Sequence, residues 1–218
     1  QEQYGDDRRT EIVPVDSDFS MEDMIAEEEV VLTITHQGYI KRTALNTYRT
    51  QRRGGRGVQG AMSKDEDFVE HLFIANTHNY MLFFTDMGKC YWLKVYDIPQ
   101  GGRAARGRAI VNLIGCDPGE RVEAFVSVKD FDEDHYIVMC TKNGIVKKTV
   151  LSAYGNPRKG GIYAIDIRDN DKLIEARITN GEHDILLGTH EGKSIRFSEN
   201  NIRSSGRKTM GVKGITLS

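Results

Sequence analysis

The sequence has few of the residues that build disulfide frameworks, metal centres or membrane spans. Its 218 residues include three cysteines, Cys90, Cys116 and Cys140, and none forms a C-x-x-C pair. This odd, widely spaced set argues against a disulfide framework and a zinc site, and fits a reducing compartment. The six histidines are scattered without metal-ligand spacing. We therefore expect no metal site. No stretch approaches the roughly 18 apolar residues of a membrane span, so we also expect no membrane partner and a cytoplasmic location.

Signatures of common catalytic sites are also missing. The chain has no G-x-x-x-x-G-K-[ST] phosphate loop, no G-x-S-x-G nucleophile turn and no H-E-x-x-H helix. The acidic cluster at residues 130–134 lacks the glycine and the spacing of a calcium loop, so a solvated loop is the better interpretation. We therefore predict that this chain contains no catalytic residue and binds no cofactor.

Charge is nearly balanced in total but unevenly distributed along the chain. The formal net charge is -2, yet residues 1–29 contain eleven acidic and two basic side chains, which leaves 28 basic and 21 acidic ones in the rest. An acidic leader before a basic body is typical of a domain that binds a polyanion. A solvated acidic linker is the alternative explanation for the leader, and the stretch at residues 20–29 could form one short helix.

A repeat of about fifty residues organises the basic body. Four segments align, each with a T-x-x-G motif: VVLTITHQGYIKRT (30–43), MLFFTDMGKCYWLK (81–94), IVMCTKNGIVKKTV (137–150) and ILLGTHEGKSIRFS (185–198). The glycines are 50, 56 and 48 residues apart. Two β-rich runs that flank a short turn ending in glycine predict a hairpin, with the glycine at positive φ.

Two further features recur in each unit. A third β-rich run follows three of the hairpins, at residues 70–75, 121–128 and 173–179, whereas the fourth unit stops before such a run. A large apolar residue lies ten positions after each motif glycine and is expected to fill the core of its unit: Tyr48, Ile98, Tyr154 and Ile202. Four-stranded units at this spacing predict an all-β, propeller-like array with about four blades, the last incomplete.

Each unit also contains a glycine-rich basic loop, and we number these loops in chain order. They are QRRGGRG (51–57), GGRAARGRAI (101–110), NPRKGGIYAI (156–165) and GRKTMGVKGI (206–215). Glycines let backbone amides approach phosphates, and arginine forks pair with phosphate oxygens, so loops repeated along one rim would form a track for nucleic acid. Alternatively, the glycines make tight turns between units and the charges are merely solvated. The recurrence at a nearly constant offset favours binding.

Further basic residues follow the motif glycines. Lys41 and Arg42 do so in the first unit, and Lys147 and Lys148 in the third. They either extend the basic track or are ordinary strand charges that prevent edge-to-edge aggregation. The second unit has Tyr91 and Trp92 at the same place, and for Trp92 packing is favoured over a contact with DNA.

The first basic loop gives the sequence a family resemblance. QRRGGRG, together with TITHQGYIKR and LNTYRT before it, closely resembles the seven-residue box in the C-terminal domain of the bacterial DNA gyrase A subunit. The resemblance covers roughly residues 27–218. It implies a β-pinwheel, a propeller-like disc whose strands cross between neighbouring blades, with duplex DNA wrapped in a positive sense around its rim. The family's disc usually has six blades, so the four counted here imply a shorter wrap.

The resemblance also implies a division of the chain and a set of partners. Residues 1–29 would be an acidic linker from an upstream catalytic core, partly disordered or helical, and residues 30–218 would be the DNA-binding domain, with repeats starting near residues 30, 81, 137 and 185. The chain would be a non-catalytic part of an ATP-dependent type II topoisomerase, found in the bacterial nucleoid. The gyrase B subunit with another copy of the A subunit would complete an A2B2 complex, and ATP and Mg²⁺ would act elsewhere in it.

The expected DNA contacts are the residues of the box and the basic residues of the other units. They are Gln51, Arg52, Arg53, Gly54, Gly55, Arg56, Gly57, Lys41, Arg42, Arg103, Arg106, Arg108, Lys147, Arg158, Lys159, Arg207, Lys208 and Lys213. Two alternatives stay open from the sequence. One is the corresponding domain of topoisomerase IV, which the intact box disfavours, and the other is a propeller that binds acidic proteins.

Overall fold

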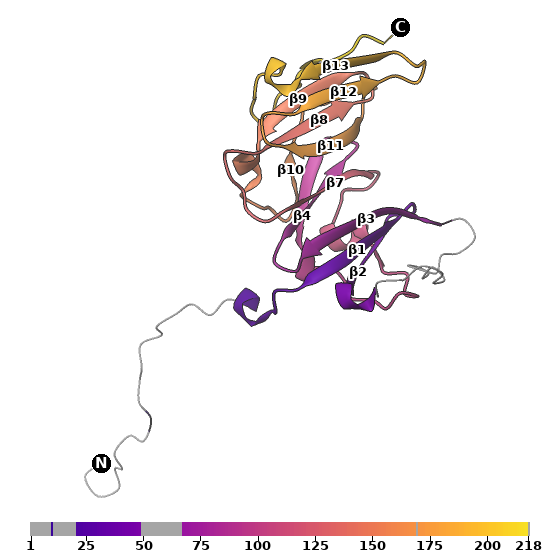
Figure 1. The fold of residues 1–218 in the computed structure, drawn as a ribbon, viewed down its shortest axis with the longest axis vertical. Coiled ribbons are helices and arrows are strands. Elements are labelled where there is room, and N and C mark those ends of the chain that lie inside the picture. The colour runs from indigo at the N-terminus through magenta and orange to yellow at the C-terminus, as the bar shows by residue number, and fades with distance from the viewer. Residues whose placement is uncertain (1–9, 11–20, 49–66, 169, 218) are drawn as a thin grey trace, which may run out of the picture.

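The computed structural model describes residue 10 and residues 21–48, 67–168 and 170–217. The first basic loop, at residues 51–57, therefore lies outside the described residues. The regular secondary structure of the described chain is mainly β-strand, and Figure 1 shows the sheets following one another along the long axis. The prediction of an all-β, repeated architecture is confirmed.

Each of the four units begins with an antiparallel hairpin, and three of them add a third strand. The first unit has β1 (Glu29–Thr35), β2 (Tyr39–Ala44) and β3 (Val69–Asn76), and the second has β4 (Tyr80–Thr85), β5 (Lys89–Lys94) and β7 (Val122–Val128). The third has β8 (Tyr136–Thr141), β9 (Ile145–Val150) and β11 (Leu173–Thr179), and the fourth has β12 (Asp184–Gly188) and β13 (Ser194–Ser198). The predicted hairpins and third strands are thus all present.

The T-x-x-G motif closes each hairpin through both of its named residues. In the first unit, the amide of Gly38 donates to the carbonyl of Thr35 at 2.8 Å, and the Thr35 hydroxyl accepts from the amide of Tyr39 at 3.2 Å. The same two hydrogen bonds recur in the other three units. The four motif glycines have φ between 76° and 84°, as the sequence predicts, because a side chain would be strained in this conformation.

The fourth strand of each complete sheet comes from the next unit. Three two-residue strands supply it: β6 (Arg108–Ala109), β10 (Ile162–Tyr163) and β14 (Val212–Lys213). They pair with β2, β5 and β9, so the sheet orders are β3-β1-β2-β6, β10-β5-β4-β7 and β11-β8-β9-β14. Each strand follows or lies within a basic loop, so these loops also join one unit to the preceding one. This exchange is the strand crossing that a pinwheel requires.

Three glycines in these loops permit the close approach of neighbouring units. Gly107 and Gly211 have φ of 89° and 90°. A Cβ atom on Gly107 would overlap the carbonyl of Ile40 in β2, and one on Gly211 would lie 2.5 Å from the carbonyl oxygen of Val146 in β9. Gly161 in the third loop faces the ring of Tyr91 in β5, at 2.8 Å from such an atom. The glycines therefore serve assembly of the fold, whatever the loops bind.

The core lies between successive sheets and includes most of the residues predicted to fill it. Ile98, Tyr154 and Ile202 are buried, whereas Tyr48 is only partly so. Each follows the second strand of its hairpin, after or within a short 3₁₀ helix: η2 (Leu45–Thr47), η3 (Val95–Asp97), η4 (Leu151–Tyr154) and η5 (Glu199–Asn201). The repeat in the sequence therefore corresponds to a repeat in the structure.

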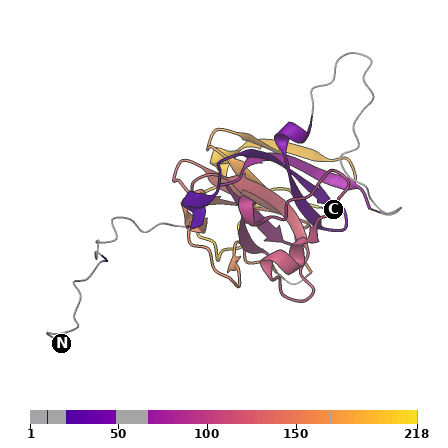
Figure 2. The ribbon, with the colours of Figure 1, turned by 90° about the horizontal axis from the view of Figure 1, so that it is seen from below.

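The fourth unit is incomplete within the described residues. There β12 and β13 form a two-stranded sheet with neither a third nor a fourth strand. Figure 1 shows this hairpin at the opposite end of the molecule from the first unit, and Figure 2 looks along the row of sheets. The described units therefore form an open arc rather than a closed ring.

Two helical segments refine the sequence interpretation. The predicted acidic helix is a single 3₁₀ turn, η1 (Met21–Met24), in which Glu22 pairs with Lys94 of β5. The short α-helix α1 (Ile110–Ile114) was not predicted; it buries Ile110 and Ile114 and ends at Gly115 in the left-handed conformation. The domain boundary proposed at residue 29 coincides with the start of β1 and remains a prediction.

The close approach at Gly107 gives a test of the strand exchange. Gly107→Ala should lower the free energy of unfolding by about 2–3 kcal/mol, because the new methyl group meets backbone atoms of β2 at a positive φ. Gly102→Ala in the same loop is the control, since nothing lies within 4 Å of the added atom and φ is not in the left-handed region. Chemical denaturation of both variants measures the difference, and equal stability would contradict the proposed role of Gly107.

Candidate nucleic-acid interface

The second, third and fourth basic loops lie on the same edge of successive sheets. Each contributes or precedes the strand that pairs with the second strand of the preceding hairpin. Each also donates a backbone hydrogen bond to the carbonyl of the preceding motif glycine: Ile110 to Gly38, Ala164 to Gly88, and Gly214 to Gly144. A repeated topology thus places the loops at equivalent positions along one rim of the arc.

Six of the predicted contact residues expose their side chains on these loops. They are Arg103, Arg108, Arg158, Lys159, Lys208 and Lys213. None of the six forms a salt bridge with another described residue. Cations that are solvated and not neutralised by protein carboxylates can pair with phosphate oxygens.

The other predicted arginines are engaged with the protein to different degrees. Arg106 is half-buried, with its guanidinium group 3.8 Å from the centre of the Tyr39 ring and donating to Gln37. The Nε of Arg42 donates to the carbonyl of Ile98 at 2.7 Å. Arg207 is also partly buried. Arg42 and Arg106 thus contact neighbouring units and offer only part of their donors to solvent.

Two of the five predicted lysines, Lys41 and Lys147, are not on the surface, which corrects the sequence interpretation. Lys41 is 2% exposed and Lys147 is 0% exposed. The Lys41 ammonium group donates to the carbonyl oxygens of Gly102 and Arg103, at 3.2 and 2.6 Å. That of Lys147 donates to the carbonyl of Ala164 at 2.7 Å and to that of Arg207. Both therefore bind the backbone of basic loops from inside and cannot reach a phosphate in this arrangement.

Burial changes the acidity of both lysines. Removal from water lowers the pKa of Lys41, and it lowers that of Lys147 to about 8, assisted by the nearby Arg207 charge and opposed by Asp166. Alternation along a strand places the adjacent residues Lys41 and Arg42 on opposite faces, so the sequence indicates that only one of them can face the rim. It does not indicate which one, and the structure shows that Lys41 points inward.

The neighbouring positions in β9 and β5 are also structural. Lys148 is buried and pairs with the carboxylate of Glu199 at 3.0 Å, so it does not extend the basic rim. The indole of Trp92 donates to the carbonyl of Tyr154 at 3.0 Å, which agrees with the packing role predicted for it. Tyr91 is buried and its hydroxyl donates to Glu120 at 2.8 Å.

The third and fourth basic loops adjoin one another. The amide of Asp166, just after the third loop, donates to the carbonyl of Thr209 in the fourth at 3.1 Å. Nearby, Arg168 approaches the sulfur of Met210 at 3.1 Å. The end of the third loop and the middle of the fourth are therefore in direct contact. The predicted box residues Gln51, Arg52, Arg53, Gly54, Gly55, Arg56 and Gly57 lie outside the described residues, and their part in the interface stays a prediction.

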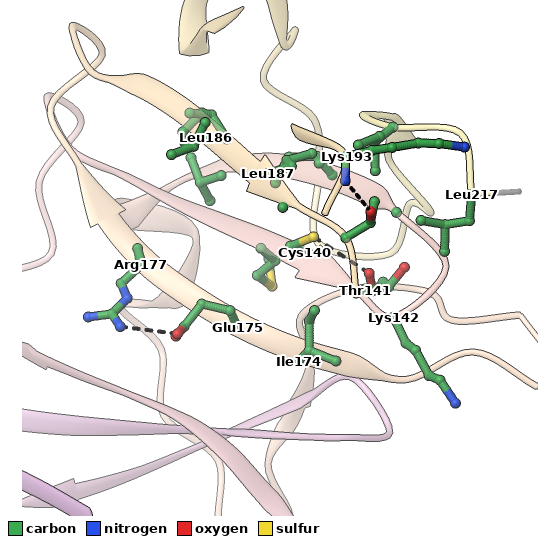
Figure 3. A pocket seen from close by; sticks show the side chains of 18 of the residues that line it. Cys140, Thr141, Lys142, Ile174, Glu175, Arg177, Leu186, Leu187, Lys193 and Leu217 are labelled. Atoms are coloured by element: carbon green, nitrogen blue, oxygen red, sulfur yellow. Dashed lines mark hydrogen bonds and ion pairs between the residues drawn. The ribbon is translucent and has the colours of Figure 1, made fainter. Parts of the chain in front are cut away.

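A cleft of about 840 Å³ lies between the third unit and the β12–β13 hairpin, and Figure 3 shows side chains that line it. Much of its lining is apolar, including Ile174, Leu186 and Leu187, and Arg177 is paired with Glu175 at its edge. Among the described residues, no group of three or more His, Cys, Asp or Glu side chains is placed to hold a metal ion. No described helix has the length and apolar character needed to cross a membrane.

Comparison with known proteins agrees with the repeat. The profile of the family described as DNA gyrase C-terminal domain, beta-propeller, matches four successive segments, residues 29–76, 79–129, 135–180 and 183–218. The chain belongs to this family. Its four segments coincide with the four structural units, so the resemblance inferred from the first basic loop is confirmed over nearly the whole described chain.

Similar sequences come from the A subunits of bacterial DNA gyrases. The chain is 52% identical to the DNA gyrase A subunit of Clostridium acetobutylicum over 97% of its length, and 47% identical to that of Haemophilus influenzae over 99%. These matches cover 25% and 24% of the relatives, so the chain spans about a quarter of their length.

Solved structures show the same fold. A DNA topoisomerase IV C-terminal domain superposes with a TM-score of 0.75 at 32% identity, over 89% of this chain and 59% of that one. A DNA gyrase A C-terminal domain gives 0.68 at 25% identity, over 88% and 61%.

The burial of Lys147 generates a prediction about pH. The folded state holds the lysine with a pKa of about 8, below its ordinary value of 10.5. Below pH 8 both states are protonated and the folded state bears the full desolvation cost; between pH 8 and 10.5 only the unfolded state binds the proton, so stability rises with pH. Relative to Lys147→Met, the wild-type protein should gain about 2 kcal/mol of stability between pH 7 and pH 9.5.

Denaturant titrations of both proteins at each pH check this gain, because other titrating groups cancel in the difference. A difference that stays constant over this range would show that Lys147 titrates normally. A gain of the opposite sign would show that the ammonium form is favoured by folding.

Proposed function

We propose that this chain is the DNA-binding and DNA-wrapping module of a DNA gyrase A subunit. The observation that carries the proposal is the placement of three glycine-rich basic loops on one edge of successive sheets, with six exposed cations that have no salt-bridge partner among the described residues. The box at residues 51–57 would continue the same track. Membership of the gyrase C-terminal domain family supports the choice of a polyanion as the ligand.

The chemistry of the loops favours contacts to the DNA backbone. Arginine and lysine pair with phosphate oxygens, and such contacts fix the position of a duplex without reading its sequence. Over the described residues, the rim presents short loops rather than a long helix or ribbon that could enter the major groove. Binding is therefore expected to depend strongly on salt and weakly on sequence.

Wrapping requires the contacts to offset the cost of bending. Bending 20–30 base pairs sharply costs several kcal/mol, about 1–6 by elastic estimates. A single loop with two exposed cations offers too few phosphate contacts to offset this bending cost. Loops repeated along an arc distribute the contacts over the whole bend. The open arc of four units would hold a shorter stretch of DNA than a closed disc.

Wrapping would serve a larger assembly. The module would be non-catalytic and would present an adjoining DNA segment to a cleavage gate formed by other parts of an A2B2 complex in the bacterial cytoplasm. Strand passage and negative supercoiling would use ATP and Mg²⁺ bound there. The size of the relatives, about four times that of this chain, leaves room for such parts.

Two alternative functions can be distinguished from this proposal, one by the parent enzyme and the other by the ligand. The topoisomerase IV domain shares the fold, but the two sequence relatives described above, at 52% and 47% identity, are gyrase subunits. A propeller that binds acidic proteins would use the same loops but would bind duplex DNA weakly even at about 50 mM salt, where phosphate contacts are strongest.

A salt series tests the proposed interface. If about six phosphates are neutralised, the logarithm of the DNA association constant should fall with the logarithm of salt concentration at a slope of about -5. The combined change Arg52→Ala, Arg53→Ala and Arg56→Ala should flatten the slope by about 0.9 for each phosphate that is no longer neutralised, and Arg158→Ala with Lys159→Ala should do the same. Gel-shift titrations between about 50 and 200 mM salt provide the measurement.

Arg177→Ala is the matched control, because Arg177 is exposed and already paired with Glu175 away from the basic loops. It should leave the slope unchanged. If the loop variants also left it unchanged, the basic rim would not be the DNA interface.

A further inference from the structure

Two buried lysines occupy the same position in two units of the repeat. Lys41 and Lys147 both stand three residues after a motif glycine, in β2 and β9. The corresponding residues of the other two units are Tyr91 and Ile195. A lysine at this place is therefore not required by the hairpin itself, and its presence in two units calls for a separate reason.

Each lysine binds the basic loop contributed by the following unit. Lys41 donates to the carbonyl oxygens of Gly102 and Arg103 in the second loop. Lys147 donates to that of Arg207 in the fourth loop and to that of Ala164 in the third. The loop residues Arg103 and Arg207 thus have their carbonyl oxygens held toward the protein by a buried ammonium group.

The direction of these carbonyl oxygens matters for an interface with a polyanion. A carbonyl oxygen carries partial negative charge and repels phosphate, whereas the arginine side chain on the same residue attracts it. The glycines before and after these positions leave the loop many alternative conformations. A cation beneath the loop favours those in which the carbonyl oxygens turn inward.

We propose that Lys41 and Lys147 are positioning residues that hold the second and fourth basic loops in the conformation that binds DNA, without contacting DNA themselves. This inference rests on the proposed function. It accounts for the presence of a charged side chain at a buried site, where desolvation of the ammonium group is costly. The third loop packs against Tyr91 through Gly161 and is also bound by Lys147, at the carbonyl of Ala164.

Substitution by methionine separates positioning from stability. Lys147→Met and Lys41→Met keep most of the aliphatic stem and remove the ammonium group. We expect melting temperatures equal to or above that of the wild-type protein, together with DNA binding at about 100 mM salt weakened about 5- to 10-fold. A loss of stability in proportion to the loss of binding, in both variants, would overturn the proposal in favour of a purely structural role.

A double-mutant cycle shows whether Lys147 acts through its loop. Arg207→Ala, Lys208→Ala and Lys213→Ala together remove the cations of the fourth loop, and Lys147→Met is measured alone and in that background by fluorescence anisotropy with a labelled duplex. The effect of Lys147→Met should fall to less than about 2-fold in the background, because no loop cation remains to be positioned. Equal effects in both backgrounds would mean that the buried charge acts directly on the DNA, which contradicts positioning.

The same double-mutant cycle can be carried out at Lys41. The cycle is repeated with Lys41→Met against Arg103→Ala and Arg108→Ala, which remove the two exposed cations of the second loop, so that failure of one variant to fold does not remove the test. If removal of the loop cations alone leaves DNA affinity unchanged at both sites, the proposed interface fails. If it weakens binding while both Lys→Met changes have no effect, the interface stands and the positioning role fails.

Discussion

The arrangement depends on one constraint, the insertion of a short strand from each unit into the sheet of the unit before it. That strand reaches its neighbour only where the chain passes so close to β2 or β9 that no side chain fits, which is why Gly107 and Gly211 adopt φ near 90°. The same segment carries the basic residues. Joining the units and presenting the cations are therefore two consequences of one backbone path.

This coupling divides the basic residues of the repeat into two kinds. Those on the loops, such as Arg158 and Lys208, face solvent and are free of protein carboxylates among the described residues. Those in the second strand of a hairpin, such as Lys41 and Lys147, are buried and bind loop carbonyls. The first kind provides a surface for phosphates, and the second kind shapes the backbone under it. Net charge alone does not separate them.

Much of this could be predicted from the sequence because the information is local and repeated. The T-x-x-G turns, the third strands and the core positions of Ile98 and Tyr154 follow from short motifs. The origin of the fourth strand could not be predicted from periodicity, because β6, β10 and β14 are two residues long and pair with strands of the preceding unit. The burial of Lys41 and Lys147 could not be predicted for a related reason. Their partners are backbone carbonyl oxygens of other segments of the chain, and a pattern of charged residues does not indicate such partners.

The central claim is that duplex DNA follows the basic edge of this arc. Ligation of nicked circular DNA in the presence of the protein measures it most directly, because any wrap becomes a fixed change in linking number after the protein is removed. Wrapping along this edge should displace the topoisomer distribution in the positive direction in proportion to bound protein, and the displacement should be smaller when Arg158 and Lys159 are changed to alanine. A distribution identical to that of protein-free DNA at saturating protein would contradict it.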